Sequence, residues 1–216
     1  MFNVFKGRLS LMSDYNPKKI LILFAHPAMQ KSKVNKRLVE PISALEGVTF
    51  HDLYDSYPDM YIDVEREKDL LLENDIIIFQ HPFYWYSSPA MLKEWQDLVL
   101  EFGFAYGPGG TALEGKKMMN VISTGASREA YRREGHNTYT IREFLRPFEQ
   151  TANLCHMKYL PPFVLHDAIN MDVNMDLLFY SELLRNMLTQ LINNKIDFKE
   201  LEDFEYFNDY FVDPEN

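Results

Sequence analysis

Strand-length apolar runs that alternate with helical patterns constrain the fold of this chain more than any other feature. The clearest run, Lys19-Ile-Leu-Ile-Leu-Phe-Ala25, is apolar without interruption after its lysine, which is typical of a parallel strand buried on both faces. A helical spacing of apolar residues follows, and Glu46-Gly47 ends it. Further strands are expected at 48–52, 75–80, 117–123 and, as a broken region, 157–165.

Helical patterns separate these strands. They are expected at 34–45, 63–73, 89–100, 140–152 and 175–192. Strand and helix thus alternate five times, and right-handed crossovers then predict a doubly wound α/β fold, a five-stranded parallel sheet with helices on both faces. We divide the chain into an N-terminal extension (1–17), this domain (18–194) and an acidic, aromatic C-terminal tail (195–216).

Charge and cysteine content narrow the possible partners. Of the net charge of -10, residues 197–216 carry -7, because eight acidic residues stand against Lys199, which leaves -3 for the rest. An acidic chain without a basic stripe is a poor match for nucleic acid or an anionic membrane. The single cysteine, Cys155, excludes an internal disulfide and a multi-cysteine metal site. We therefore expect a cytoplasmic protein with no nucleic-acid partner and no metal.

The tail itself is too aromatic for a purely solvated segment. We expect it to pack on the body of the protein, with binding to a partner as the alternative. The aromatic residues that interleave with its acids are Phe198, Phe204, Tyr206, Phe207, Tyr210 and Phe211.

Ligands of a doubly wound fold bind beyond the carboxyl ends of its strands, so three loops matter most: 26–35, 81–89 and 124–139. In the first, a helix beginning near Lys33 leaves free N–H groups, and with Ser32 and Asn35 this suits a phosphate monoester. The alternative is that Ser32 only caps the helix and that His26 is an ordinary histidine with satisfied hydrogen bonds. Taken by itself, the loop favours this alternative.

The second loop holds four consecutive aromatic residues, 83–86, at the end of a buried strand. Such rings and their backbone suit one wall of a slot for a flat heterocycle. The alternative is that Trp85 and Tyr86 pack in the core or against another subunit. For Leu92 and Trp95, on the following helix, we expect core packing.

The third loop contains Thr124-Gly125-Ala126, then Tyr131 and His136. Gly125 would let the backbone approach a ring edge, where neighbouring amides can donate to a carbonyl. Tyr131 and His136 form a possible pair of donors, although residues of these types are often mere surface groups.

The chain contains four motifs in a fixed order. They are His26-Pro27 with Ser32 and Asn35, the run 82–86 leading into 89–95, 104–107 with 109–116, and Ser123-Thr124-Gly125. Together they resemble the NAD(P)H:quinone oxidoreductase family of flavodoxin-like flavoproteins. The runs 145–148 and 160–163 most resemble the bacterial branch that includes ancillary subunits of glutathione-gated potassium efflux systems. The resemblance covers about residues 18–193.

The resemblance implies FMN as cofactor and NAD(P)H as electron donor. It places the phosphate on the first loop and the isoalloxazine ring against the backbone of the second and third. Tyr131 and His136 match positions beside the pyrimidine edge of the flavin, and Ala126 stands where the family more often has a second glycine. The implied cofactor-binding residues are His26, Ser32, Asn35, Pro82, Phe83, Tyr84, Trp85, Tyr86, Thr124, Gly125 and Ala126.

The activity that this implies is two-electron reduction of a quinone. A hydride would pass from the nicotinamide to the flavin, and negative charge would grow at the flavin edge that Tyr131 and the amides near Gly125 face. His136 is the expected proton donor. Because the quinone would use the vacated nicotinamide position, we expect ping-pong kinetics. The family also implies a homodimer in which a second subunit completes the site.

Two other functions stay open. One is a regulatory flavoprotein subunit of a potassium efflux antiporter, which would hold the chain at the periphery of the inner membrane. The other is a one-electron flavodoxin-type carrier. It is less favoured, because the Thr- and Gly-rich phosphate loop expected in a flavodoxin is absent after the first strand.

Overall fold

The computed structural model describes residues 16–172 and 175–212. Most of the expected N-terminal extension therefore lies outside the described residues. Within the described parts of the chain, no helix is both long and apolar enough to cross a bilayer.

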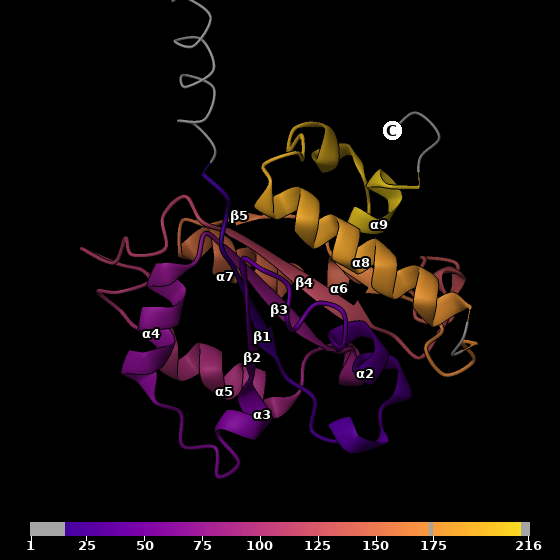
Figure 1. Cartoon of the computed structure of the whole chain (residues 1–216), viewed down its shortest axis with the longest axis horizontal. Coiled ribbons are helices and arrows are strands. Elements are labelled where there is room, and N and C mark those ends of the chain that lie inside the picture. Colours follow the sequence, from indigo (N-terminus) through magenta and orange to yellow (C-terminus); the bar gives the residue numbers. More distant parts are fainter. Residues whose placement is uncertain (1–15, 173–174, 213–216) are drawn as a thin grey trace, which may run out of the picture.

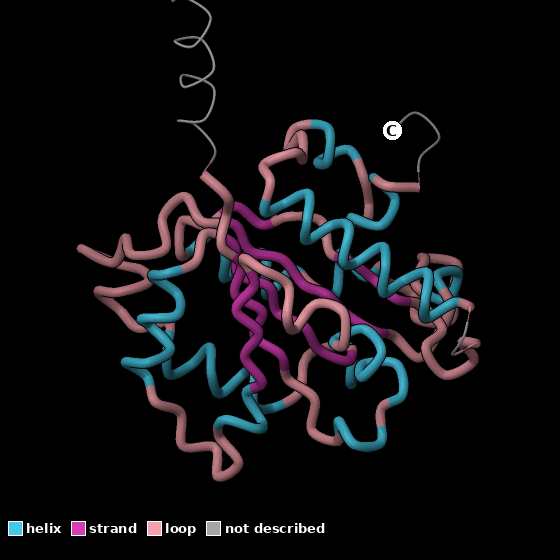
Figure 2. The backbone as a smooth tube through the Cα atoms, in the orientation of Figure 1, coloured by secondary structure: helices cyan, strands magenta, loops and turns pink. Residues whose placement is uncertain are grey.

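A parallel sheet forms the centre of the molecule (Figures 1 and 2). Its strands are β1 (Ile20–Phe24), β2 (Val48–Asp52), β3 (Ile76–Pro82), β4 (Lys117–Ser123), β5 (Lys158–Tyr159) and β6 (Phe163–Leu165). The order is β2-β1-β3-β4, and both β5 and β6 pair with the outer side of β4. The predicted doubly wound fold is confirmed, and the switch in strand order lies between β1 and β3. Pro161-Pro162 divides the fifth strand region into two pieces, because proline cannot donate to the ladder.

Helices cover both faces of the sheet (Figure 1). They are α2 (Lys33–Val39), α3 (Leu53–Ser56), α4 (Val64–Glu73), α5 (Ala90–Val99), α6 (Ile141–Phe144), α7 (Arg146–Leu154), α8 (Asp176–Ile192) and α9 (Phe207–Tyr210), with 3-10 turns η1 (Met29–Lys31), η2 (Tyr84–Tyr86), η3 (Arg128–Ala130) and η4 (Glu200–Asp203). Two expected helices differ. α2 ends at Val39 instead of 45, next to Pro41, and the helix expected at 140–152 divides into α6 and α7 at Leu145, just before Pro147. The turn α3 was not expected.

The core has two halves, one on each face of the sheet. Ile20 and Ile22 of β1 pack with α2 and α8, whereas Leu21 and Leu23 pack with the helices of the opposite face. This explains why β1 is apolar at every position, since both of its faces are buried. Leu92 and Trp95 are completely buried, as predicted from their positions on the helix.

The C-terminal segment, defined as residues 195–212, packs on the body of the protein. Leu201 and Phe207 are completely buried, and both belong to the core cluster that includes α8. The side chain of Asn208 bonds twice to Val164 of β6: its Oδ1 accepts from the Val164 N–H (2.8 Å), and its Nδ2 donates to the Val164 carbonyl (3.1 Å). The prediction that the tail packs is thereby confirmed for the described residues.

Candidate functional site

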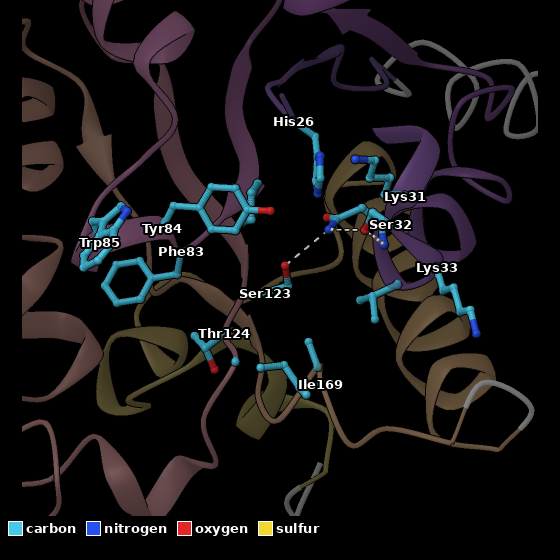
Figure 3. A pocket seen from close by; sticks show the side chains of 15 residues that line it. His26, Lys31, Ser32, Lys33, Phe83, Tyr84, Trp85, Ser123, Thr124 and Ile169 are labelled. Carbon is cyan, nitrogen blue, oxygen red and sulfur yellow. Dashed lines mark hydrogen bonds between the residues drawn. The ribbon is translucent and has the colours of Figure 1, made fainter. Parts of the chain in front are cut away.

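A cavity of about 570 Å³ opens at the carboxyl ends of β1, β3 and β4 (Figure 3), within the range of roughly 300–1,000 Å³ usual for ligand sites. It lies beside the switch in strand order, where ligands of this fold class bind. All three loops singled out from the sequence contribute to it. The lining residues are His26, Lys31, Ser32, Lys33, Val34, Asn35, Pro82, Phe83, Tyr84, Trp85, Ser123, Thr124, Gly125, Ala168 and Ile169.

One end of the cavity is built from hydrogen-bond donors of the first loop. The N–H of Ala28 donates to Nδ1 of His26 (3.1 Å), so the neutral ring carries its proton on Nε2. Burial lowers the pKa of His26, which favours that neutral form. Oγ of Ser32 accepts from the backbone N–H of Asn35 (3.1 Å) and from its Nδ2 (3.0 Å), which leaves the hydroxyl proton of Ser32 for another acceptor. Ser32 is thus an N-cap and also a donor at the cavity.

Two lysines give this end a positive charge. Lys31 and Lys33 line the cavity on either side of Ser32, and Figure 3 shows all three on the same side as His26. Among the described lining residues none is acidic. Neither lysine was expected to contact a ligand, although both are adjacent to Ser32 in the sequence, and this adjacency indicates a place at the same end of the cavity. The end of the cavity near α2 therefore suits an anion.

The opposite wall is aromatic and conformationally strained. Phe83, Tyr84 and Trp85 line it, and Trp85 adopts the left-handed conformation (φ 50°, ψ 42°), followed by Tyr86 at φ 61°. Such a conformation costs an L-residue roughly 1–2 kcal/mol, and strain of this kind is concentrated at functional sites. The indole of Trp85 is 93% exposed. Tyr86 lies outside the lining, where its ring stacks on Phe144 with centroids 5.0 Å apart.

A buried polar chain holds the start of this turn. Tyr159 donates to Oδ1 of Asn120 (2.6 Å), which assigns the other amide atom, Nδ2, as the donor to Nε2 of His81 (3.1 Å). Nδ1–H of His81 then donates to the carbonyl of Pro82 (3.0 Å). Burial lowers the pKa of His81 to about 4, so the ring is neutral at physiological pH and can both accept and donate. The roles of His81 and Asn120 were not expected from the sequence.

The third loop approaches the cavity through Thr124 and Gly125. Oγ1 of Thr124 donates to the carbonyl of Ala126 (2.8 Å), which closes the turn, and Ala126 itself lies outside the lining. A Cβ on Gly125 would lie 3.0 Å from Cδ1 of Ile169, tighter than ordinary packing. The glycine therefore permits Ile169, from the loop after β6, to close over this side. Ala168 and Ile169 were not expected from the sequence, because no loop after the fifth strand was considered.

The two residues expected to donate at a ring edge lie away from the lining. Tyr131 is buried behind Phe83 with ring centroids 6.0 Å apart, and burial raises the pKa of its phenol, so its proton is retained. His136 is exposed on the same loop. Of the expected binding residues, Tyr86 and Ala126 are also outside the lining, and the other nine all line it.

Beneath the floor of the cavity lies a polar side chain that the protein leaves without a partner. Gln80 is 1% exposed, and neither atom of its amide has a hydrogen-bond partner among the residues that the structure describes. Pro82, two positions further along the same strand, lines the cavity, and so does Ser123, which pairs with Pro82 on the neighbouring strand. Residues two apart on a strand share a face, so Gln80 lies one pleat below that floor.

Comparison with known proteins gives relatives over most of the chain. A family model described as flavodoxin-like fold matches residues 18–178. The glutathione-regulated potassium-efflux system ancillary protein KefG of Serratia proteamaculans (strain 568) is 53% identical over 152 residues, which are 70% of this chain and 83% of that protein.

Solved structures share the same architecture. General stress protein 14 of Treponema denticola, in complex with FMN, is 38% identical, with a TM-score of 0.71 over 78% of this chain and 99% of that one. An NADPH-quinone reductase from P. pentosaceus is 37% identical, with a TM-score of 0.68 over 76% and 96%. A structure described as a thermophilic tryptophan halogenase from Streptomycin violaceusniger is 46% identical, with a TM-score of 0.75 over 77% and 96%. The halogenase description is not shared by the other three proteins.

Proposed function

Because this chain belongs to the flavodoxin-like family, with KefG ancillary proteins and NAD(P)H:quinone reductases among its relatives, we propose that it is an FMN-dependent NAD(P)H:quinone oxidoreductase. The observation that carries this proposal is the cavity itself, which joins a cationic end to an aromatic wall at the switch in strand order.

The residues present fit FMN at both ends of the cavity. At the first, Nε2–H of His26, the hydroxyl of Ser32 and the ammonium groups of Lys31 and Lys33 suit a phosphate dianion. At the other, the aromatic wall suits a flat ring. Gln80, whose amide has no hydrogen-bond partner among the described residues, adds a buried polar side chain beneath the floor.

FMN, when bound, supplies a ring that accepts a hydride and gathers negative charge along one polar edge. The backbone at Gly125 and Ala126 is proposed to face that edge, and Tyr131, whose raised pKa keeps it protonated, is proposed to donate nearby. His136, exposed on the same loop, is proposed to take a proton from solvent to the site. Overall, NAD(P)H, a proton and a quinone would give NAD(P)⁺ and a hydroquinone. One binding position used in turn by donor and acceptor predicts ping-pong kinetics.

A homodimer is part of the proposal. The side chains of Tyr84, Trp85 and Tyr86, in the aromatic turn at the cavity, are exposed by 44%, 93% and 48%, which is unusual for aromatic rings near one site. A second subunit that covers them would also shield the cavity from water. A monomer in light scattering at micromolar concentration would contradict this part of the proposal.

The identity to KefG favours a second role, in which the flavoprotein binds and regulates a potassium efflux antiporter at the cytoplasmic side of the inner membrane. Catalysis and regulation are compatible. Cofractionation with an antiporter, together with loss of efflux control on deletion, would support regulation, and wild-type efflux in the deletion strain would argue against it.

The deciding experiment for the enzyme is the absorbance spectrum of the purified full-length protein, followed by anaerobic NADPH and then a quinone. We expect a flavin spectrum, bleaching by NADPH in a two-electron step, and recovery of the colour with the quinone. Tyr131→Phe should slow the bleaching without release of FMN. A protein that stays colourless after reconstitution with FMN would refute the proposal.

A further inference from the structure

The C-terminal segment contacts the third loop of the candidate site through Arg128. This residue opens the turn η3, three positions after Gly125, and its guanidinium forms a fork with Asp209: Nη1 to Oδ1 at 2.7 Å and Nη2 to Oδ2 at 2.8 Å. Nη2 also contacts Oε2 of Glu205 at 3.1 Å, and the guanidinium carbon lies 4.5 Å from the ring centroid of Tyr206. Bidentate and stacked contacts of this kind fix an arginine in position as well as in charge.

The segment that holds Arg128 is itself firmly attached. Tyr206 and Phe207 are buried, the N–H of Phe207 donates to the carbonyl of Pro162 (2.9 Å), and Asn208 forms its two bonds to Val164. Asp209 and Glu205 are therefore presented to Arg128 from a packed anchor on the sheet.

Contacts continue from this anchor to Thr124 and Tyr131, at the two ends of the first part of the third loop. The ring of Tyr206 lies 5.4 Å from that of His166, and His166 lies 5.9 Å from Tyr131. Nδ1 of His166 is 3.3 Å from Oγ1 of Thr124, at the start of the loop. The backbone between Thr124 and Tyr131 is thus tied to the C-terminal segment at its beginning, at Arg128 and at its end.

We propose that Arg128, Asp209 and Glu205 form an ion triad that positions the loop 125–131, so that the C-terminal segment is a structural part of the candidate active site. The function assigned to that loop rests on the proposed FMN-dependent activity. The three residues are positioning residues, because Arg128 fixes the backbone of the loop and does not itself contact the ligand. Their side chains are exposed by 38%, 26% and 41% for Arg128, Asp209 and Glu205, so salt is expected to weaken the triad.

Two variants of the full-length protein test the triad. Asp209→Asn removes a charge and retains an acceptor, and Arg128→Lys retains the charge and loses the fork. We expect each to reduce the rate of flavin bleaching by NADPH about tenfold, as small misplacements at an active site do, while FMN affinity changes less. High salt should slow the wild type and leave the variants nearly unchanged. The double variant should be no slower than the singles.

The matched control is Glu202→Gln. Glu202 pairs with Lys158 and so ties the same segment to the sheet at a place away from the third loop. We expect this variant to keep the wild-type rate. Equal slowing by Glu202→Gln and Asp209→Asn would overturn the proposal, and so would a wild-type rate in Asp209→Asn.

Hydrogen exchange of the FMN-free protein separates this proposal from the proposed activity. Amides in 125–131 should exchange faster in Asp209→Asn than in the wild type or in Glu202→Gln, whether or not FMN binds. Unchanged exchange there would overturn the triad as a positioning device. Faster exchange in a protein that never binds FMN would refute only the proposed activity.

Discussion

Nδ1 of His81 lies 3.0 Å from the carbonyl oxygen of Pro82, the residue at which the strand ends and the strained aromatic turn begins. The bond is directed by Asn120, which occupies Nε2 and so leaves the proton on the side of Pro82. A polar contact between neighbouring strands thereby controls the backbone of the wall that is proposed to face the flavin.

Replacing His81 with phenylalanine tests that control. His81→Phe keeps an aromatic ring beside Phe148 but leaves the carbonyl of Pro82 and Nδ2 of Asn120 unpartnered, which should cost about 2 kcal/mol of unfolding free energy. FMN affinity should fall as well, measured by titration of the apoprotein. Tyr159→Phe, which removes a bond at the far end of the chain and leaves the His81–Pro82 bond in place, should reduce FMN affinity less. Equal losses of affinity in both variants would contradict the idea.

The stability of the protein should depend on pH through the same ring. The pKa of His81 is about 4 in the folded protein and near 6.5 in the unfolded chain, so the unfolded chain binds more protons between these values. The contribution of neutral His81 to the free energy of unfolding is therefore complete above pH 6.5 and decreases as the pH falls toward 4. At pH 5 it has decreased by about 2 kcal/mol. His166, whose pKa burial also lowers to about 4, acts in the same direction.

Urea unfolding at pH 7 and pH 5 measures this dependence. The wild type should lose stability between the two values, and His81→Phe should lose less because one of the histidines whose pKa is lowered in the folded protein is gone. An equal loss in both proteins would show that other groups cause the pH dependence.

The lysines beside Ser32 should select a phosphorylated ligand. Lys33→Gln removes one of the two positive charges at that end of the cavity and should weaken FMN binding roughly tenfold, or ~1.4 kcal/mol, at low salt. Riboflavin, which lacks the phosphate, should bind both proteins alike. Lys36→Gln is the control, since Lys36 bonds to the carbonyl of Gln30 and lies outside the lining. A similar loss of riboflavin affinity in Lys33→Gln would refute an anion-binding role.

Gln80 should affect stability and binding in opposite directions. Gln80→Met removes a buried amide that has no partner in the described part of the chain, so the FMN-free protein should gain about 1 kcal/mol of stability. Affinity for FMN should nevertheless fall if the amide supports the occupied floor of the cavity. Ile78→Met, on the same face one pleat further from the cavity, should leave affinity unchanged. A variant that is more stable and binds FMN normally would leave Gln80 without a role in binding.

Much of the fold could be predicted because its signal is local. The apolar run of β1, the helical spacing of α8 and the cap at Ser32 each depend on residues close together in the sequence. The break at Pro161-Pro162 was expected as well, whereas the early end of α2 next to Pro41 was not.

Only the site residues that directly follow a strand could be predicted from the sequence. His26, Trp85 and Gly125 follow strands, and the switch in strand order brings them together. The polar chain to His81 requires three strands in register, and the pairing of Arg128 with Asp209 joins residues 81 positions apart. No spacing in the sequence predicts such contacts, because packing between distant elements determines them.

The two bonds between Asn208 and Val164 have a consequence for how this protein is handled in the laboratory. They occupy backbone groups of β6, an outermost strand whose free groups would otherwise be a template for pairing with another molecule. A shortened version of the chain that ends before Phe207 would expose that template together with the apolar surface that Phe207 covers. Such a version should aggregate, and the natural C-terminal segment therefore protects the solubility of the fold.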